Sequence, residues 1–213
     1  MAKPLITIKE AHSIENIINK SRFIAYIKPV HTEDEAKSFI NEIKSKHKDA
    51  THNCSAYTVG PEMNIQKAND DGEPSGTAGT PMLEILKKLD VHDVCVVVTR
   101  YFGGIKLGGG GLIRAYSGAV RDVIYDAGRV ELKEAVPVTV TLSYDQTGKF
   151  EYELASTPYI LRNQFYTDKV SYQIDVVKED YEAFIHFLNR ITAGNYDIEK
   201  EDIKLLPFDI TTT

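Results

Sequence analysis

The sequence predicts an α+β protein of two domains, and three observations support this. The 213 residues are 42% hydrophobic and 26% charged, an ordinary globular composition that excludes disorder throughout. Short β-branched runs alternate along the chain with stretches whose apolar residues recur every three or four positions, so strands and helices are mixed. This alternation restarts near residue 135, which predicts an N-terminal domain over residues 1–135 and a C-terminal domain over residues 136–213.

The first predicted elements are a β-α unit and a hairpin. Residues 23–30 read as a short strand, and the apolar residues that follow have helical spacing, namely Ala36, Phe39, Ile40 and Ile43. Two strand-like runs lie on either side of the Gly60-Pro61 pair, which predicts a hairpin. The second run ends in a turn-rich segment, DDGEPSGTAG.

A helix, a buried strand and a long helix follow. Thr80 is expected as the N-cap of the first helix, with Pro81 in its first position. The run DVCVVVTRYFG is continuously apolar and β-branched, which predicts a strand that is buried on both faces. After a run of four glycines, the apolar residues form one stripe of a long helix, and Gly128 is expected to end it.

The C-terminal domain is predicted to contain elements in the order β-α-β-β-α-β. This order over roughly 75 residues is that of a ferredoxin-like sandwich. Its first strand alternates apolar and polar residues from Val136 through Tyr144. The remaining elements are expected near residues 147–156 (helix), 159–166 and 172–176 (strands), 181–191 (helix) and 203–208 (strand).

The net charge of −6 is distributed unevenly along the chain. Residues 1–140 hold 18 basic and 18 acidic residues, whereas residues 141–213 hold 7 and 13, so the C-terminal domain carries the acidic excess. A protein that is basic throughout and binds nucleic acid by its overall charge is thereby excluded. From Val94 to Arg121, however, there are four basic residues and no acidic one, which leaves room for a local basic patch.

The sequence also favours a cytoplasmic protein. No apolar run reaches the length of about 18 residues that a membrane helix needs, and the first residues lack the pattern of a secretory signal. We therefore expect no membrane partner. The two cysteines, Cys54 and Cys95, are too few for a disulfide framework, which fits a reducing compartment.

The glycine run is the first candidate site. Gly108, Gly109, Gly110 and Gly111 precede a helix, where unpaired backbone N–H groups and the helix dipole favour an anion. Lys106 and Arg114 flank the run, Arg100 precedes it, and Tyr101 and Phe102 could stack on unpaired bases. The run matches neither the P-loop nor the GxGxxG pattern. Two interpretations of the glycine run remain. It binds an anion or the RNA backbone, or its glycines only permit a tight turn and close helix packing.

An acidic segment is the second candidate. Asp70, Asp71 and Glu73 fall in one turn and could hold Mg²⁺ or Ca²⁺, although the spacing is not that of an EF-hand. A rigid loop with local hydrogen bonds is the favoured alternative. If this loop packs near the glycine run, charge pairing accounts for both without a metal. We accordingly predict no metal and no cofactor.

His52 and Cys54 are the third candidate. Their spacing places both on one face of a strand, so a thiol nucleophile with its base is conceivable. A packed histidine beside a small buried cysteine is the favoured interpretation. The sequence contains neither HExxH nor GxSxG, and catalytic activity is therefore not the first expectation.

Four long motifs resemble those of the YigZ/IMPACT family. They are SRFIAYIKPV, ATHNCSAYTVG, NDDGEPSGTAGTPMLEIL and VVVTRYFGGIKLGGGGLIRAYSGAVRDV. The chain resembles the bacterial two-domain members. This resemblance implies a fold like the second domain of ribosomal protein S5 for residues 1–135. For residues 136–213 it implies a fold like the ferredoxin-like domain V of elongation factor G. Asp70, Asp71, Glu73, Arg100, His52 and the glycines match family motif positions, with no catalytic role implied.

The resemblance also implies a link to translation, because the eukaryotic relatives act in translation control. Our first hypothesis is a noncatalytic regulatory protein that binds RNA or the ribosome through the basic glycine-rich segment and contacts a translation-factor protein through its acidic domain. One alternative is a small-molecule enzyme that binds a phosphorylated ligand at the same segment. The other is a protein–protein adaptor. Because fold analogy is only associational, the site must decide between them.

Overall fold

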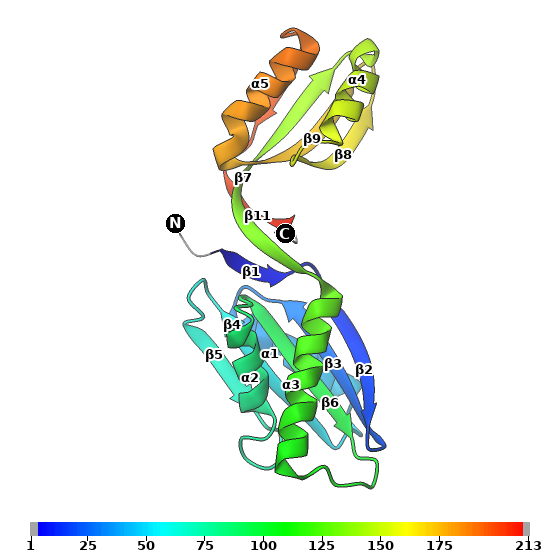
Figure 1. The fold of residues 1–213 in the computed structure, drawn as a ribbon, viewed down its shortest axis with the longest axis vertical. Helices are drawn as coiled ribbons and strands as arrows, with labels where there is room; N and C mark the ends of the chain where they lie inside the picture. Colours follow the sequence, from blue (N-terminus) through cyan, green and yellow to red (C-terminus); the bar gives the residue numbers. More distant parts are fainter. Residues whose placement is uncertain (1–3, 211–213) are drawn as a thin grey trace. The chain divides into compact units, whose positions relative to one another are not determined.

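The structure is a computed structural model that describes residues 4–210 and contains two compact units (Figure 1). The N-terminal unit comprises the described residues up to 131 together with 209 and 210, and the C-terminal unit comprises residues 132–208. The first three residues of the predicted N-terminal domain and the last three of the predicted C-terminal domain lie outside the described residues. Both units mix helices with antiparallel strands, so the α+β prediction is confirmed.

The N-terminal unit is built on a five-stranded sheet in which all neighbouring strands are antiparallel. The order across the sheet is β2 (His12–Ile18), β3 (Ser21–Pro29), β6 (Val94–Tyr101), β4 (His52–Val59) and β5 (Ile65–Asn69). A further short strand, β1 (Leu5–Ile8), makes a single parallel bridge from Ile6 to Val91. The central strand β6 is therefore paired along both of its edges.

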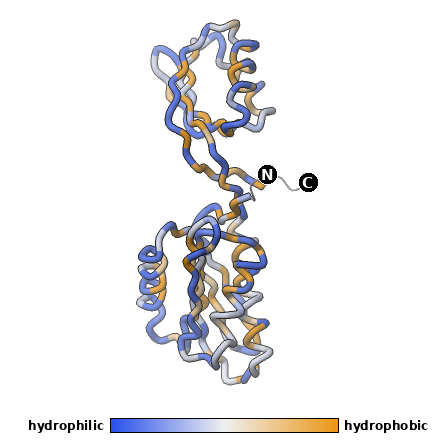
Figure 2. The backbone as a smooth tube through the Cα atoms, turned by 90° about the vertical axis from the view of Figure 1, so that its left-hand side faces the viewer, coloured by the Kyte–Doolittle hydropathy of each residue, from blue (hydrophilic) through white to orange (hydrophobic). Residues whose placement is uncertain are grey.

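Helices cover both faces of this sheet, and each face has its own hydrophobic core. The helix α1 (Glu33–Lys46) packs on one face, where the core includes Cys95 and Val97 of β6. The helices α2 (Gly79–Lys88) and α3 (Gly108–Ala127) pack on the other, against Val96 and Val98. The strands at the centre of this unit carry long hydrophobic stretches (Figure 2). Burial on both faces explains why β6 does not alternate, as predicted.

The C-terminal unit has the predicted order of elements, with one additional strand. Antiparallel pairing places β9 between β7 and β8, while β10 and β11 pair with β7. Two helices contribute Phe150, Leu154, Phe184 and Leu188 to a core with the inner residues of β7 and β9. The elements are β7 (Arg129–Leu142), α4 (Tyr144–Leu154), β8 (Ile160–Tyr166), β9 (Val170–Val177), the 3₁₀ turn η1 (Lys178–Asp180), α5 (Tyr181–Thr192), β10 (Asp197–Lys200) and β11 (Lys204–Asp209).

Two helix starts differ from the prediction. Thr80 does not cap α2, because the helix already begins at Gly79 and its cap is Ala78. The carboxylate that receives the free N–H groups there comes from Asp70, far outside the helix. Tyr144 does not continue the strand β7 but opens α4, because Ser143 forms a capping box with Gln146. The spacing of serine and glutamine is a known sequence signal for such a start.

Candidate functional site

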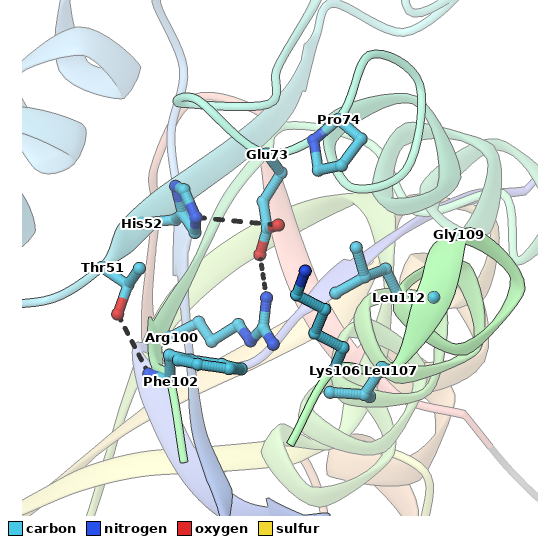
Figure 3. Close-up of a pocket in the computed structure, with 11 residues that line it drawn as sticks. Thr51, His52, Glu73, Pro74, Arg100, Phe102, Lys106, Leu107, Gly109 and Leu112 are labelled. Atoms are coloured by element: carbon cyan, nitrogen blue, oxygen red, sulfur yellow. Dashed lines mark hydrogen bonds and ion pairs between the residues drawn. The ribbon is translucent and has the colours of Figure 1, made fainter. Parts of the chain in front are cut away.

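The acidic loop (residues 70–79) and the glycine-rich segment (residues 101–111) meet in the N-terminal unit. Between them lies a cavity of about 360 Å³, which we call the two-loop pocket (Figure 3). The sequence identified both segments but did not show that they meet. The pocket is lined by Thr51, His52, Glu73, Pro74, Arg100, Phe102, Lys106, Leu107, Gly108, Gly109 and Leu112.

Strand pairing explains why these segments converge. In the register of the sheet, Arg100 near the end of β6 lies directly opposite His52 at the start of β4. On its other side Arg100 lies opposite Phe23 of β3. Because side chains alternate between the faces of a strand, Arg100 shares the face of Val96 and Val98, which is the face covered by α2 and α3. The glycine-rich segment leaves this same strand and returns as α3.

A buried ion pair forms the floor of the two-loop pocket. The Arg100 guanidinium donates from Nη1 to Oε1 of Glu73 at 2.7 Å, and the two side chains are 6% and 2% exposed. The Tyr116 hydroxyl of α3 donates to the same carboxylate oxygen at 2.7 Å. Burial, followed by the interactions with Cys54 and Glu73, raises the pKa of Tyr116 well above its ordinary value. Tyr116 therefore stays protonated as a donor.

Arg100 retains one unused hydrogen-bond donor. Its Nε atom is buried and has no hydrogen-bond partner among residues 4–210. The same side chain lines the two-loop pocket and lies 5.5 Å from the centre of the Phe102 ring. An unpaired buried donor is unusual in a folded protein.

His52 lies on the pocket wall with both ring nitrogens directed at acceptors. Its Nδ1 atom is 2.8 Å from the carbonyl oxygen of Asp71, and a carbonyl oxygen can only accept, so Nδ1 carries a proton. Its Nε2 atom lies 3.7 Å from Oε2 of Glu73. The motif histidine is therefore part of the pocket wall and fastens the acidic loop through Nδ1.

The acidic loop is held by the chain itself rather than arranged around a cation. One oxygen of Asp70 accepts the N–H groups of Ala78 and Gly79, at 3.1 and 2.8 Å, and the other accepts that of Gly76 at 2.9 Å. Partial burial raises the pKa of Asp70, but these three backbone hydrogen bonds outweigh it and leave the pKa below its usual value. Asp70 thus acts as a cap for α2.

Asp71 is also fully engaged. It accepts from Nζ of Lys44 at 2.6 Å and from the backbone N–H of Asn53 at 2.7 Å. Burial raises the pKa of Asp71, while Lys44 and Asn53 together lower it below its usual value. Within residues 4–210, no group of three His, Cys, Asp or Glu side chains is placed to hold a metal ion. The Mg²⁺ or Ca²⁺ alternative therefore does not fit the carboxylates of this loop.

Cys54 does not pair with His52 as a nucleophile. Its thiol is fully buried and donates to the carbonyl oxygen of Asp70 at 3.0 Å. Burial raises the pKa of the Cys54 thiol to about 12, so the thiolate that a nucleophile needs is absent near neutral pH. The two side chains do share one face of the strand, as predicted, and both use it to fasten the acidic loop.

The basic residues do not form a single patch. Arg100 is 5% exposed and paired with Glu73, which contradicts its expected exposure beside Lys106 and Arg114. Lys106 is exposed and extends into the two-loop pocket, with its ammonium directed toward Glu73 and Arg100 (Figure 3). Arg114 is exposed and lines a different cavity. The three basic residues are close in sequence, but Arg100 is buried on β6 while Lys106 and Arg114 are exposed at different cavities.

The start of α3 is open, in contrast to the start of α2. Gly108, Gly109, Gly110 and Gly111 form its first turn rather than a preceding loop. Its N-cap, Leu107, makes no side-chain hydrogen bond to the helix, and no described side chain occupies the free N–H groups. Since Gly108 and Gly109 line the two-loop pocket, these donors lie at its edge. A helix start of this kind favours an anion.

Aromatic and apolar side chains complete the pocket. Phe102 is 46% exposed and lines the pocket, whereas the hydroxyl of Tyr101 is bonded to His47 and Tyr116 is buried. Of these three aromatic residues, Phe102 is therefore the one that presents its ring to the pocket. Sequence reasoning missed Thr51, Pro74, Leu107 and Leu112, because single apolar or small residues in loops carry no chemical signature.

Comparisons with known proteins place the chain among relatives of similar length. A family model for the Impact N-terminal domain matches residues 19–124, and one for a domain of unknown function (DUF1949) matches residues 140–195. The chain is 47% identical to the IMPACT family member YvyE of Bacillus subtilis, over 97% of this chain and 95% of that protein. It is 32% identical to the IMPACT family member YigZ of Escherichia coli, over 97% and 91%.

Solved structures also match. A crystal structure described as that of a hypothetical protein superposes with a TM-score of 0.60 and 28% identity, over 95% of this chain and 99% of the other. A structure of the two-domain translational regulator Yih1 matches with a TM-score of 0.35 and 26% identity, over 57% and 46%. Among residues 4–210, no helix is both long and apolar enough to cross a membrane.

Proposed function

The chain belongs to the IMPACT family, and from this premise we propose that it is a noncatalytic, translation-linked regulatory protein that binds RNA at the two-loop pocket. One observation carries the proposal. The pocket combines three features. Gly108 and Gly109 form the open start of α3, Lys106 is a cation without an ion-pair partner among the described residues, and Phe102 presents a half-exposed aromatic ring. These are the groups that hold a phosphate and stack on an unpaired base.

The phosphate is assigned to the edge of the pocket where α3 begins. Free N–H groups of the first turn donate to phosphate oxygens, and the helix dipole adds attraction for negative charge. The Lys106 ammonium supplies a full charge beside them. Glycine permits the close approach of a ligand to the backbone. The segment from Val94 to Arg121 contains no acidic residue, and the carboxylate that does line the pocket, Glu73, is paired with Arg100.

The base is assigned to the apolar interior. Phe102 presents its exposed ring, and Pro74, Leu107 and Leu112 provide apolar walls. Stacking of a base on an aromatic ring contributes about 1–3 kcal/mol and tolerates any base. A volume of about 360 Å³ lies at the lower end of the roughly 300–1,000 Å³ range of ligand pockets. The pocket therefore suits one nucleotide.

The buried Glu73–Arg100 pair acts as a rigid wall. Its charges largely cancel, so Arg100 adds little free positive charge to the pocket. This differs from the role of a direct phosphate contact that the sequence suggested for Arg100.

The acidic C-terminal domain is assigned to a protein partner such as a translation factor. The ribosome would present both RNA and protein partners. We also propose the folds named from the resemblance, S5 domain 2-like and elongation factor G domain V-like.

The test is RNA binding across a salt series. Fluorescence anisotropy with a labelled single-stranded RNA would measure the dissociation constant of the parent, Lys106→Ala and a control, Lys88→Ala. Lys88 is an exposed lysine of α2 that does not line the pocket. We expect Lys106→Ala to weaken binding for all RNA sequences and to reduce the salt dependence by about one phosphate contact, a slope change near 0.7. Equal binding by parent and Lys106→Ala would reject the site.

A second candidate function has one observation in its favour. His52 and Glu73 face each other across 3.7 Å inside the same pocket, and such a pair could move a proton on a phosphorylated small molecule. A thermal-shift screen with nucleotides and sugar phosphates separates the candidates, because a bound ligand raises the melting temperature by mass action. A shift with a sugar phosphate but no binding of RNA would favour the enzyme.

A further inference from the structure

A second cavity lies on the other side of the start of α3. It has a volume of about 220 Å³ and shares Leu107 with the two-loop pocket. We call it the Arg114 cavity. Its lining consists of Ile18, Asn19, Leu107, Gly111, Arg114 and Ala115. The turn between β2 and β3, which provides Ile18 and Asn19, therefore belongs to the same surface as the glycine-rich segment.

Helix geometry places the two cavities on opposite sides of one helix end. Gly109 lines the two-loop pocket and Gly111 lines the Arg114 cavity. Successive residues of an α-helix are rotated by about 100°, so residues two apart point about 200° away from each other. The free N–H groups of the first turn lie between them. A chain that runs from one cavity to the other over Leu107, which lines both, passes the start of α3.

The Arg114 cavity has the chemistry of a second nucleotide site. Arg114 is exposed and, among residues 4–210, has no acidic partner. Asn19 adds an amide that can donate and accept hydrogen bonds, and Ile18 with Ala115 provides apolar surface. An arginine is well suited to hold phosphate because its planar fork can donate two bonds at once. The cavity lacks an aromatic ring, so it is the weaker of the two sites.

We propose that one RNA strand crosses the start of α3, with one nucleotide in the two-loop pocket and its neighbour in the Arg114 cavity. The phosphate that joins the two nucleotides lies over the N–H groups of Gly108–Gly110. This inference rests on the proposed function of the two-loop pocket and names its ligand as a single strand of at least two nucleotides. Duplex RNA is excluded as the direct ligand, because a paired base cannot enter a pocket.

Exposed apolar side chains near the start of α3 suggest a competing occupant, a protein partner. Ile105 and Ile113 are both 42% exposed. The open N–H groups and the unpaired Lys106 and Arg114 favour a polyanion over an apolar protein surface. A protein partner is therefore the occupant that remains if no RNA binds to the parent in the test below.

The test compares RNA ligands that differ by one nucleotide. Uridine and adenosine series of one, two and four nucleotides, each with a 5′-phosphate, would be titrated calorimetrically against the parent, Arg114→Ala and Arg121→Ala. Arg121 is the matched control, because it is an equally charged, exposed arginine on the same helix that is engaged with Asp122. Both variants change exposed side chains, and thermal melting would verify that they fold.

In the parent, the dinucleotide should bind about tenfold more tightly than the mononucleotide, the effect of one additional charge-assisted hydrogen bond. Arg114→Ala should remove this advantage and leave mononucleotide binding unchanged, while Arg121→Ala should behave as the parent. If mononucleotides bind but dinucleotides gain nothing, or if both variants lose equally, the strand path is wrong and the proposed function stands. If no RNA binds to the parent, the proposed function fails and the inference with it.

Discussion

Arg100 and Glu73 form an ion pair of 2.7 Å that is almost completely removed from solvent, and it joins the central strand of the N-terminal sheet to the acidic loop. A pair of this kind costs desolvation energy when it forms, and removal of one partner leaves an uncompensated buried charge. The pair is consequently both a structural contact and the floor of the two-loop pocket.

The first prediction concerns this ion pair. Arg100→Met and Glu73→Gln should each lower the free energy of unfolding by about 3–5 kcal/mol, because each leaves the other charged side chain buried without its partner. The double variant should be less destabilised than the sum of the two, because neither charge is left alone. Urea unfolding followed by circular dichroism would measure this. Additive losses would mean that the two side chains do not interact. Arg100 is therefore an unsuitable residue for testing RNA binding alone.

The second prediction concerns the cap of α2. Asp70→Ala should destabilise the protein by about 0.5–2 kcal/mol at pH 7, because three backbone N–H groups lose their acceptor. The pKa of Asp70 is lowered in the folded state, so its stabilisation is complete above the unfolded pKa and is lost as the pH falls through the folded pKa. The difference from the parent should thus shrink below about pH 4. Asp49→Ala, at an exposed position, is the control and should change little.

The third prediction concerns Gly103. A Cβ atom at this position would lie 1.9 Å from the carbonyl oxygen of Lys20, and backbone atoms cannot move aside as a flexible side chain can. Gly103→Ala should therefore cost at least about 1–3 kcal/mol, the range of overpacked substitutions. Gly104→Ala is the control, because its Cβ would meet open space and only its φ of +86° adds about 1–2 kcal/mol of strain. Melting temperatures that rank the two variants in the opposite order would contradict the packing.

The fourth prediction concerns the open start of α3. Gly109→Ala should raise the stability by about 0.5–1 kcal/mol, because glycine is a poor helix former and a Cβ here makes only ordinary contacts. Gly109→Asp should keep part of this gain through the helix dipole and abolish RNA binding by placing a negative charge at the phosphate site. Chemical unfolding and RNA titration on the same two variants would test it. Unchanged RNA binding by Gly109→Asp would contradict the phosphate assignment.

The fifth prediction concerns the cysteines. Burial raises the pKa of both Cys54 and Cys95 to about 12, so neither thiol should react with an aromatic disulfide reagent at pH 8 in the folded protein. Both should react once urea unfolds the chain. Rapid reaction of one thiol in the native protein at neutral pH would instead support a reactive cysteine.

Much of the fold follows from local patterns. The buried strand β6, the helix α3 and its end at Gly128 were predicted because their signals lie within the segments themselves. The strands β1, β2 and β10 were not predicted. In β10, Ile198 is the single large apolar residue of four. The edge strand β2 alternates in burial, but its apolar residues do not alternate in sequence, because Ile17 and Ile18 are adjacent. Such strands are fixed by pairing with neighbours, which no local pattern records.

The site was predicted in part. The sequence identified both loops and His52, because their residue types are those of binding chemistry. It did not place Arg100 beside Glu73 or His52, since that depends on the register that sets β4 opposite β6. It also treated Lys106 and Arg114 as one patch, although a helix start with a cavity on each side separates them. Contacts between distant segments require the three-dimensional arrangement.

Tyr116 links the interior of the N-terminal unit to the pocket floor. Its ring packs edge-on against Phe23 at 5.4 Å, and its hydroxyl holds Glu73. Any rotation or sliding of α3 would break both contacts at once. The pocket is thereby preorganised: its shape is set when the protein folds, so little conformational entropy is lost when a ligand enters.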